Sequence, residues 1–307
     1  MEVTYRRNPT RATWSSLIQS AYESDYWSMS VTDLQLWRKA FGKRFEILVA
    51  FDPSFYPVGC ICATTYSHRS SPSRTTFIGF FYVIQRYRGN GIGNELFRQM
   101  ISDKKNCNLY LNSSWTMIEK YRLRYNFSIS TDWKFRYYEV NPAHLRFTNP
   151  RIPNSSKIVN LNETNLQGVL KYDDTFHDLE RSTFMKLFLT QDCAETKVAH
   201  EGDNVIGVGT ARLLPHGHLF IGPLYAKDQE IAKTLLLQLI RGRYYGRYVN
   251  IQFRIPTTNE NAKQFLDAIS GERWTSNYYT IGLSTQSPLL VNMAQVYCIC
   301  EDDLSAV

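Results

Sequence analysis

The amino-acid sequence predicts a mixed α/β protein that contains two similar halves, each a mixed sheet covered by helices. Strand-like and helix-like segments follow one another in the same order on both sides of a segment rich in proline and asparagine. The halves also keep nearly the same register, because Val49-Ala50 and Val58-Gly59 are echoed by Val198-Ala199 and Ile206-Gly207. Repetition at this scale indicates a tandem duplication of one α/β unit.

The first half is predicted from the spacing of its apolar residues, which alternate in strands and recur every three or four residues in helices. A short strand comes first, then two helices, then a β-hairpin that turns through Asp52, Pro53 and Ser54. A strand, a helix, a strand and a helix follow. The predicted elements are residues 3–7, 10–22, 31–41, 45–51, 58–67, 75–84, 91–105, 108–112 and 115–125.

The second half repeats this order, with a hairpin that turns through Gly202 and Asp203. Between the halves, Asn141 to Ser156 contain three prolines, three asparagines and two serines, a composition typical of a linker. We therefore expect domains at residues 1–145 and 157–307, joined by a linker at 146–156. The predicted elements of the second half are residues 157–162, 165–176, 181–189, 196–200, 205–213, 218–222, 228–240, 248–254 and 259–268.

Composition narrows the function classes. The chain has 307 residues, of which 43% are hydrophobic and 21% charged, as in ordinary globular proteins. The net charge of +7 suits a polyanionic cofactor, and because the basic residues are scattered, no nucleic-acid partner is expected. The longest apolar run, residues 77–84, is far shorter than the roughly 20 residues that span a bilayer. We expect an intracellular, cytoplasmic protein, with the nucleus as an alternative location.

Six cysteines include two Cys-x-Cys pairs, Cys60/Cys62 and Cys298/Cys300. Both pairs lie in strand-like apolar runs, where alternation places the two thiols on one face and favours packing as small hydrophobic groups. Zinc sites use a different spacing more often, so the sequence predicts no metal.

The segment from Gln85 to Asn94 contains three glycines between a predicted strand and a predicted helix. Such a turn presents backbone N–H groups at a helix N-terminus, which favours a phosphate. A P-loop would need Gly-Lys-Ser/Thr after its second glycine, and none is present. A dinucleotide fingerprint would need a third glycine where Asn94 stands.

The remaining pattern is Arg88-Gly89-Asn90-Gly91-Ile92-Gly93, with Val83 five residues before the arginine. This pattern resembles the acyl-CoA-binding turn of the GCN5-related N-acetyltransferases. The order of elements in each half is also similar to one domain of that family. The resemblance implies acetyl-CoA as co-substrate. The implied cofactor-binding residues are Tyr82, Val83, Arg88, Gly89, Asn90, Gly91, Ile92, Gly93 and Asn94.

The second half resembles the second domain of tandem family members through Gly222-Pro223-Leu224-Tyr225-Ala226 and the helix that follows. It lacks the glycines of the first turn. The resemblance therefore implies a domain that is degenerate for CoA and shapes the acceptor pocket or the cleft between the domains.

In the family, a neutral amine attacks the thioester carbonyl directly, and a strand N–H, here between Tyr82 and Ile84, stabilises the oxygen. A tyrosine five residues before the Phe of a Gly-Phe pair protonates the leaving thiolate. Here Asn126-Phe127 replaces that pair, Arg122 stands at the tyrosine position, and Tyr121 is the chosen general acid.

Three residues are candidates for the general base. Glu23 and Asp25 are expected in the loop between the first two helices, and His68 ends a strand. The surrounding Tyr22–Trp27 mixes acidic and aromatic residues, which suits a cationic or aromatic amine. A solvated loop and a proton path through water are open alternatives.

The sequence thus predicts an acyl-CoA-dependent N-acetyltransferase whose acceptor is a small or amino-acid-like amine. One alternative is a CoA-binding regulatory protein without turnover, which the displaced tyrosine favours. Another is a protein- or RNA-directed acetyltransferase. The acceptor and the oligomeric state are not predicted.

Overall fold

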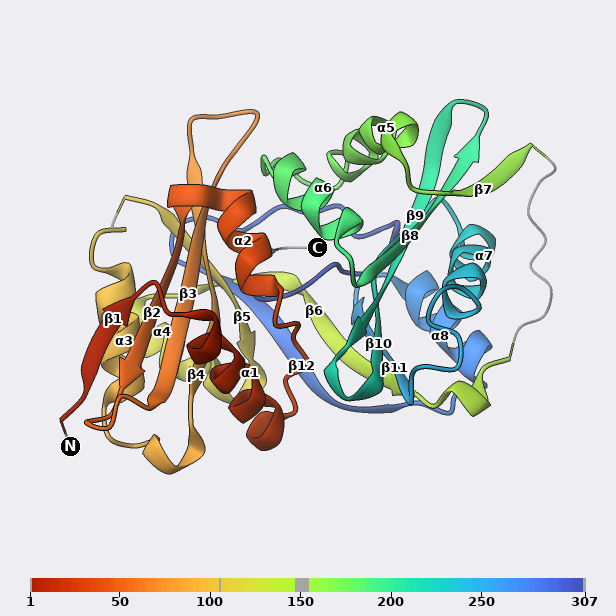
Figure 1. Cartoon of the computed structure of the whole chain (residues 1–307). Helices are drawn as coiled ribbons and strands as arrows, with labels where there is room; N and C mark the ends of the chain where they lie inside the picture. Colours follow the sequence, from red (N-terminus) through yellow and green to blue (C-terminus); the bar gives the residue numbers. More distant parts are fainter. Residues whose placement is uncertain (1, 105, 147–154, 306–307) are drawn as a thin grey trace.

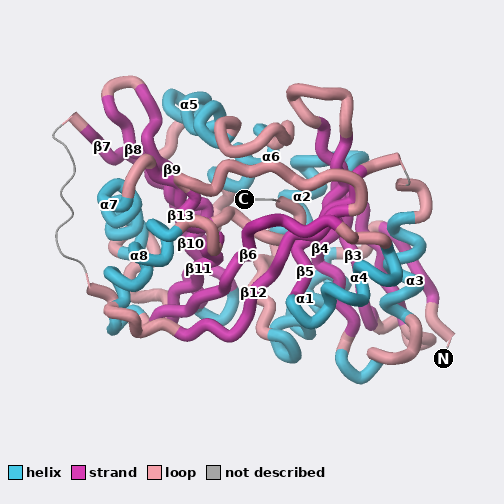
Figure 2. Tube along the Cα trace, turned by 180° about the vertical axis from the view of Figure 1, so that it is seen from behind, coloured by secondary structure: helices cyan, strands magenta, loops and turns pink. Residues whose placement is uncertain are grey.

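The computed structural model describes residues 2–104, 106–146 and 155–305. Its strands form a single mixed sheet that runs through both halves of the molecule (Figures 1 and 2). The strand order is β1-β2-β3-β4-β5-β12-β6-β11-β10-β9-β8-β7, and β13 pairs with β10. The predicted class, a mixed α/β fold with two similar halves, is confirmed.

The first half follows the predicted order. Its strands are β1 (Thr4–Arg7), β2 (Phe45–Phe51), β3 (Pro57–Ser67), β4 (Arg74–Val83), β5 (Asn108–Ser114) and β6 (Ile129–Val140). Its helices are α1 (Arg11–Asp25), α2 (Asp33–Phe41), α3 (Ile92–Ile101) and α4 (Ile118–Tyr125). Short 3-10 turns are η1 (Gly42–Arg44), η2 (Gln85–Tyr87), η3 (Trp115–Met117) and η4 (Pro142–His144).

The second half repeats the pattern. Its strands are β7 (Ser156–Asn160), β8 (Ala194–Glu201), β9 (Asn204–Leu214), β10 (His218–Ala226), β11 (Asn250–Pro256), β12 (Thr275–Ser284) and β13 (Val296–Cys298). Its helices are α5 (Glu163–Asp173), α6 (Ser182–Thr190), α7 (Gln229–Ile240) and α8 (Glu260–Ser270), and η5 is Pro215–Gly217.

The halves exchange their last long strands. β6 belongs to the first half by sequence, yet it pairs with β11 of the second half. Conversely, β12 pairs with β5 of the first half and with β6. The domain boundaries predicted at 145 and 157 stay a prediction, and the exchange joins the halves by sheet hydrogen bonds.

Three hydrophobic clusters hold the layers together. One lies between the halves, where the rings of Phe41 (α2) and Phe184 (α6) stack 5.5 Å apart. A second packs α3 and α4 on the sheet of the first half, and a third packs α7 and α8 on that of the second. Each cluster removes apolar side chains from water, which is the main stabilising contribution to such a fold.

Strands β4 and β5 diverge along their length. They pair in parallel only from Thr75 to Phe77 and from Asn108 to Tyr110. Beyond that point the register between β3 and β4 shifts, and Phe80 has a φ of 38°, as in a β-bulge that re-aims the strand. The divergence opens one side of β4 toward the glycine-rich turn.

Strands β10 and β11 diverge at the corresponding place in the second half. They pair from His218 to Ile221, and β13 then lies against β10 at Leu224 and Tyr225. The N–H of Ala226 donates to Gln295 O at 3.0 Å, and the N–H of Ile299 donates to Arg254 O at 3.1 Å. The chain's own C-terminal segment therefore fills the second divergence.

Several predicted boundaries differ from the structure, and two of these differences concern residues singled out from the sequence. Helix α1 runs through Glu23 and Asp25 to the left-handed cap at Tyr26, so these acids do not lie in an interhelical loop. Nothing in Glu23-Ser24-Asp25 breaks a helix, whereas apolar spacing alone ended it early. Strand β10 continues to Ala226 beyond Gly222-Pro223, because Pro223 sits at the register shift of the pairing with β9.

The linker predicted at residues 146–156 lies largely outside the described residues. Arg146 is described, and its N–H donates to Ile269 O at 2.6 Å. Among the helices of the described ranges, none is long and apolar enough to cross a membrane.

Candidate functional site

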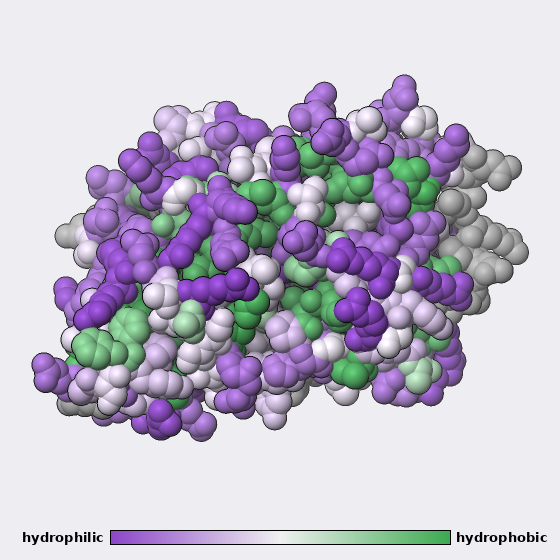
Figure 3. All heavy atoms as spheres, in the orientation of Figure 1, coloured by the Kyte–Doolittle hydropathy of each residue, from purple (hydrophilic) through white to green (hydrophobic). Residues whose placement is uncertain are grey.

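A cavity of about 1610 Å³ lies where β4 and β5 diverge. Its walls come from the end of α1, β4, the glycine turn, α4 and β6, and on the other side from β11, β12 and the C-terminal segment. The cavity therefore contains residues of both halves. On the face of the molecule shown in Figure 3, hydrophilic residues predominate and apolar ones gather mainly across the middle.

The glycine turn forms one end of the cavity. Gly89 and Gly91 have φ of 84° and 80°, and a Cβ built on either would meet nothing within 4 Å. Other L-residues are strained at such φ values, so glycine is needed for the backbone to turn here. Gly91 is the N-cap residue of α3, and glycine has no side chain that could accept a hydrogen bond from that helix end. Its N–H groups are therefore positioned for an anion.

Arg88 is one of the residues that line the cavity. Its Nε donates to Val83 O at 2.8 Å, and its guanidinium forms an ion pair with Asp25. Arg86 instead lies over the rings of Tyr56 and Tyr87. Arg88 thus ties the end of α1 to the end of β4.

The predicted cofactor residues are brought together with one exception. All of them except Asn90 line the cavity: Tyr82, Val83, Arg88, Gly89, Gly91, Ile92, Gly93 and Asn94. Asn90 is exposed and donates from Nδ2 to Tyr87 O at 3.2 Å, so it stabilises the turn itself.

Two main-chain N–H groups near the predicted oxyanion site already have acceptors. The N–H of Ile84 donates to Val58 O at 2.9 Å, and that of Phe80 donates to Asp303 Oδ1 at 3.0 Å. Ile84 is therefore excluded from the predicted range, which leaves Val83 and Tyr82, whose N–H lies against the Cys60 thiol.

Tyr121 lines the cavity from α4. Its ring packs against Phe97 and Phe127, and its residue is 7% exposed. Burial raises the pKa of Tyr121, with smaller contributions from Tyr278 and Tyr125. The hydroxyl therefore stays protonated at neutral pH, which a general acid requires. Arg122, at the family's usual tyrosine position, points elsewhere and donates to Ser130 Oγ at 2.9 Å.

Of the three residues predicted as general-base candidates, only Asp25 lines the cavity. Asp25 lines the cavity and accepts a hydrogen bond from Ser24 Oγ at 2.8 Å besides its ion pair with Arg88. Glu23 is exposed, pairs with Gln19, and is not among the lining residues. His68 lies outside the cavity too, between Asp178 and Thr75.

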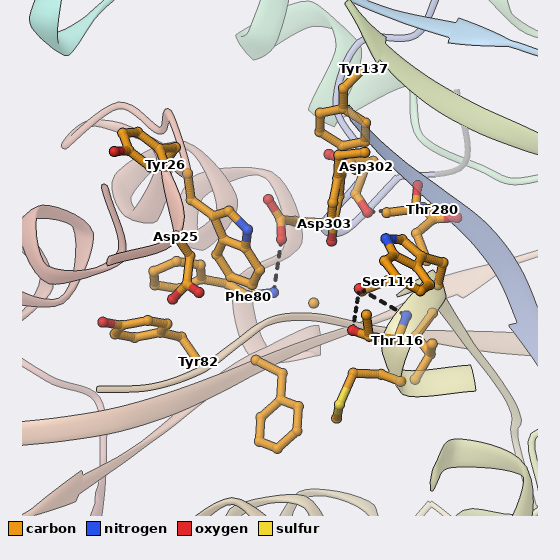
Figure 4. Close-up of a pocket in the computed structure, with 18 of the residues that line it drawn as sticks. Asp25, Tyr26, Phe80, Tyr82, Ser114, Thr116, Tyr137, Thr280, Asp302 and Asp303 are labelled. Carbon is orange, nitrogen blue, oxygen red and sulfur yellow. Dashed lines mark hydrogen bonds between the residues drawn. The ribbon is translucent and has the colours of Figure 1, made fainter. Parts of the chain in front are cut away.

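Sequence reasoning missed the carboxylates of the C-terminal segment. Asp302 and Asp303 line the cavity, as Figure 4 shows, and the preceding residue Glu301 is buried. Arg254 forms an ion pair with Asp302 at 2.6 Å. The only signal in the sequence is the run Glu301-Asp302-Asp303 after an apolar strand, and nothing in that run predicts its burial.

Burial shifts the ionisation of this acidic segment. It raises the pKa of Asp303, although Arg254 and the Phe80 N–H act in the opposite direction. Burial and the neighbouring Asp303 and Asp33 raise the pKa of Glu301 to about 8. The cause is the cost of placing several carboxylates away from water and close to one another.

A second missed residue is Thr280 of β12. It is 3% exposed and lines the cavity, and its Oγ1 has no hydrogen-bond partner among the described residues. Figure 4 labels it with Asp302 and Asp303 among the residues that line the cavity. A buried hydroxyl without a partner costs about 1–3 kcal/mol, so a polar group at this position would be stabilised.

Two family models match the chain. The Acetyltransferase (GNAT) family model matches residues 12–118, and the Acetyltransferase (GNAT) domain model matches residues 169–282. Together the matches span more than two thirds of the 307 residues. The chain belongs to the GCN5-related N-acetyltransferase superfamily, with two such domains in tandem. This is a superfamily of acyl-CoA N-acyltransferases, so the predicted family is confirmed.

Solved structures agree with this fold. A Pyrococcus horikoshii protein described as a candidate acetyltransferase is 17% identical with a TM-score of 0.73, over 99% of this chain and 96% of its own. A tandem GNAT protein from the clavulanic acid biosynthesis pathway is 12% identical with a TM-score of 0.69, over 92% and 98%.

A curated relative shares more sequence over a shorter stretch. An uncharacterized protein of Caenorhabditis elegans is 22% identical over 197 residues. The match covers 58% of this chain and 57% of that protein's length. In the part of the chain that the structure describes, no group of three or more His, Cys, Asp or Glu is placed to hold a metal ion.

Proposed function

We propose that the chain is an N-acyltransferase that takes acetyl from acetyl-CoA in the first-half cavity. The observation that supports this most is the divergence of β4 and β5 next to an uncapped helix N-terminus. The divergence leaves room for the pantetheine arm, and the helix end favours the pyrophosphate. Lys120 and Arg124 line the same cavity and add positive charge for the remaining phosphate.

The amine and the thioester meet in one ternary complex. The amine nitrogen forms a bond to the acetyl carbon, and the carbon–sulfur bond breaks as the tetrahedral intermediate collapses. Tyr121 gives a proton to the departing thiolate and is reprotonated from the nitrogen. Turnover in a thiol-release assay should fall about tenfold in Tyr121→Phe, and unchanged turnover would remove Tyr121 from the mechanism.

The CoA site is tested by isothermal titration of acetyl-CoA into three proteins. Gly91→Glu places a carboxylate at the N-terminus of α3, and we expect affinity to fall by at least about tenfold. Gly246→Glu is the matched control, because Gly246 is exposed, has φ of 74°, and an added Cβ meets nothing within 4 Å. It should bind like wild type.

The expected stoichiometry is one acetyl-CoA per chain, because the second divergence contains β13. Two per chain would mean that the second half also binds. No binding of acetyl-CoA or CoA to the wild-type chain would end the proposal.

A further inference from the structure

The C-terminal segment from Ile299 to Ser305 is held by both halves. Tyr66 donates from its hydroxyl to Leu304 O at 2.7 Å, and Asn112 Nδ2 donates to Asp302 O at 2.9 Å. From the second half, Arg181 donates to Ser305 Oγ. These contacts from separate elements fix the main chain of the segment, and therefore the direction of its side chains.

Asp303 lies at the point where β4 parts from β5. Its Oδ1 accepts the N–H of Phe80 in the β-bulge at 3.0 Å, and its main chain passes against Gly79. A Cβ on Gly79 would lie 2.1 Å from Asp303 O, so only glycine permits this approach. Asp303 thereby lines the cavity beside Phe80, as Figure 4 shows.

Asp303 has no direct ion-pair partner among the described residues, although the positive charge of Arg254 acts on it over a longer distance. Asp25 pairs with Arg88, and Asp302 pairs with Arg254. Within the described chain, no Lys or Arg nitrogen forms an ion pair with Asp303, and no group is seen to donate a hydrogen bond to its Oδ2. A carboxylate in this setting favours a cationic partner.

Two further observations point to a polar, cationic ligand beside Asp303. Thr280 lines the same cavity, and its buried hydroxyl has no hydrogen-bond partner among the described residues. The ring of Trp27 lies 5.7 Å from that of Phe80 and 6.1 Å from that of Tyr82, so aromatic groups also border the space. Aromatic faces and a carboxylate together suit an ammonium group on an apolar body.

We propose that Asp303 receives the ammonium group of a small cationic amine and takes its proton, with Thr280 binding a polar atom of the same acceptor. This inference rests on the proposed acyltransferase function. The carboxylate accepts one proton from the ammonium, and the neutral nitrogen then attacks the thioester carbon. The proton on Asp303 passes to solvent after the product leaves.

The other charged groups near Asp303 act in both directions. Glu301, Asp302 and Asp33 disfavour its ionised form, while Arg254 favours it. The reaction needs the ionised form, so kcat/KM should rise with pH until Asp303 is deprotonated.

The test uses Asp303→Asn, which is close in shape and keeps an acceptor oxygen for the Phe80 N–H. Asp303→Glu is the conservative variant. Thiol release from acetyl-CoA is followed with tyramine, putrescine, glucosamine and a lysine-containing peptide, and acetyl-CoA affinity is measured in parallel. We expect turnover of a small amine, a fall in kcat/KM of about a hundredfold in Asp303→Asn, loss of the acidic limb of the pH profile, and partial rescue in Asp303→Glu.

Acetyl-CoA binding should be unchanged in both variants, which separates this inference from the proposed function. Failure of wild type to bind acetyl-CoA removes the function and the inference together. If wild type binds acetyl-CoA, three results overturn the inference alone. They are full activity of Asp303→Asn with an unchanged pH profile, turnover of the peptide only, and no turnover or binding of any cationic amine.

Discussion

The two halves use the same divergence between parallel strands in opposite ways. In the first half, β4 and β5 part beside a glycine turn and border a cavity. In the second half, β10 and β11 part, and β13 occupies the position between them. A duplicated unit can therefore keep its sheet while only one copy keeps room for a ligand.

The N-termini of the corresponding helices, α3 in the first half and α7 in the second, also differ. Gly91 leaves the N-terminus of α3 without a side-chain cap, whereas the carboxylate of Asp228 accepts the Ile231 N–H at 3.0 Å in α7. An aspartate at this position already satisfies the helix end and repels a phosphate. The second half thus lacks both the space and the electrostatic preference for CoA.

The segment that fills the second divergence continues into the first cavity. After β13 the chain passes Cys300 and presents Asp302 and Asp303 at the bulge of β4. The same C-terminal segment therefore fills the divergence in the second half and supplies carboxylates to the cavity of the first half. The three changes below act on the anchors of this segment and on the cavity that it enters.

The largest effect is expected for Asp173→Asn. Asp173 and Arg181 form an ion pair with both side chains buried, and Arg181 also holds Ser305 and Tyr225. Removing the carboxylate leaves a buried guanidinium without its counter-charge, which costs about 3–5 kcal/mol of unfolding free energy. Denaturant unfolding of this variant is compared with Asp174→Asn, where a partly exposed pair with Arg69 contributes less than about 1 kcal/mol.

The same pair sets a pH dependence. Burial acts to raise the pKa of Asp173, but Arg181 and His177 outweigh it and hold the pKa below its ordinary value. The stabilisation is therefore present above a pH of about 4 and is lost as the pH falls further. Wild type should lose stability over that range, and Asp173→Asn should lose less. Parallel curves for the two proteins would contradict this account.

A smaller loss is expected for Asn259→Ala. Asn259 Nδ2 donates to Met293 O, Ala294 O and Val296 O, and its Oδ1 caps α8. Losing the cap and the clamp on β13 should cost about 2–3 kcal/mol. Asn162→Ala is the matched control, since Asn162 caps α5 from an exposed position and should cost only about 1 kcal/mol.

Asn259→Ala also tests why the second half is expected not to bind CoA. Its acetyl-CoA stoichiometry should stay at one, because Asp228 still caps α7. A second binding site in this variant would show that β13 alone keeps the second half from binding.

The smallest effect is expected for Thr280→Val. Because the hydroxyl has no partner in the described structure, its removal should leave the free energy of unfolding unchanged or raise it by about 1 kcal/mol. Thr75→Val is the control, since Thr75 Oγ1 has His68 Nε2 at 2.9 Å and its loss should destabilise by about 1 kcal/mol. Destabilisation of Thr280→Val by as much as its control would mean that the hydroxyl has a structural partner.

The sequence predicted the strands and helices well where apolar spacing is regular, as in β2 at Phe45–Phe51. It also identified the glycine turn, because only glycine accepts the φ values of Gly89 and Gly91. These features depend on local residues, so a single sequence contains enough information for them.

The strand exchange and the C-terminal carboxylates could not be predicted in the same way. Which strand lies beside β5 depends on contacts between residues some 170 positions apart, such as Ser114 with Thr280. An acidic run such as Glu301-Asp302-Asp303 is most often exposed, and only the tertiary contacts with Tyr66, Asn112 and Arg254 bury it. Helix α1 extended to Asp25 for a related reason, since local spacing does not fix a helix end.

Hydrogen–deuterium exchange with and without CoA tests the difference between the two halves most directly. We expect CoA to protect main-chain amides in residues 83–94 and to leave those in residues 225–232 unchanged. We also expect residues 293–300 to exchange slowly in both states, because β13 is hydrogen bonded in the free chain. Protection of residues 225–232 by CoA, or faster exchange in residues 293–300 when CoA binds, would contradict the assignment of one binding cleft to the first half.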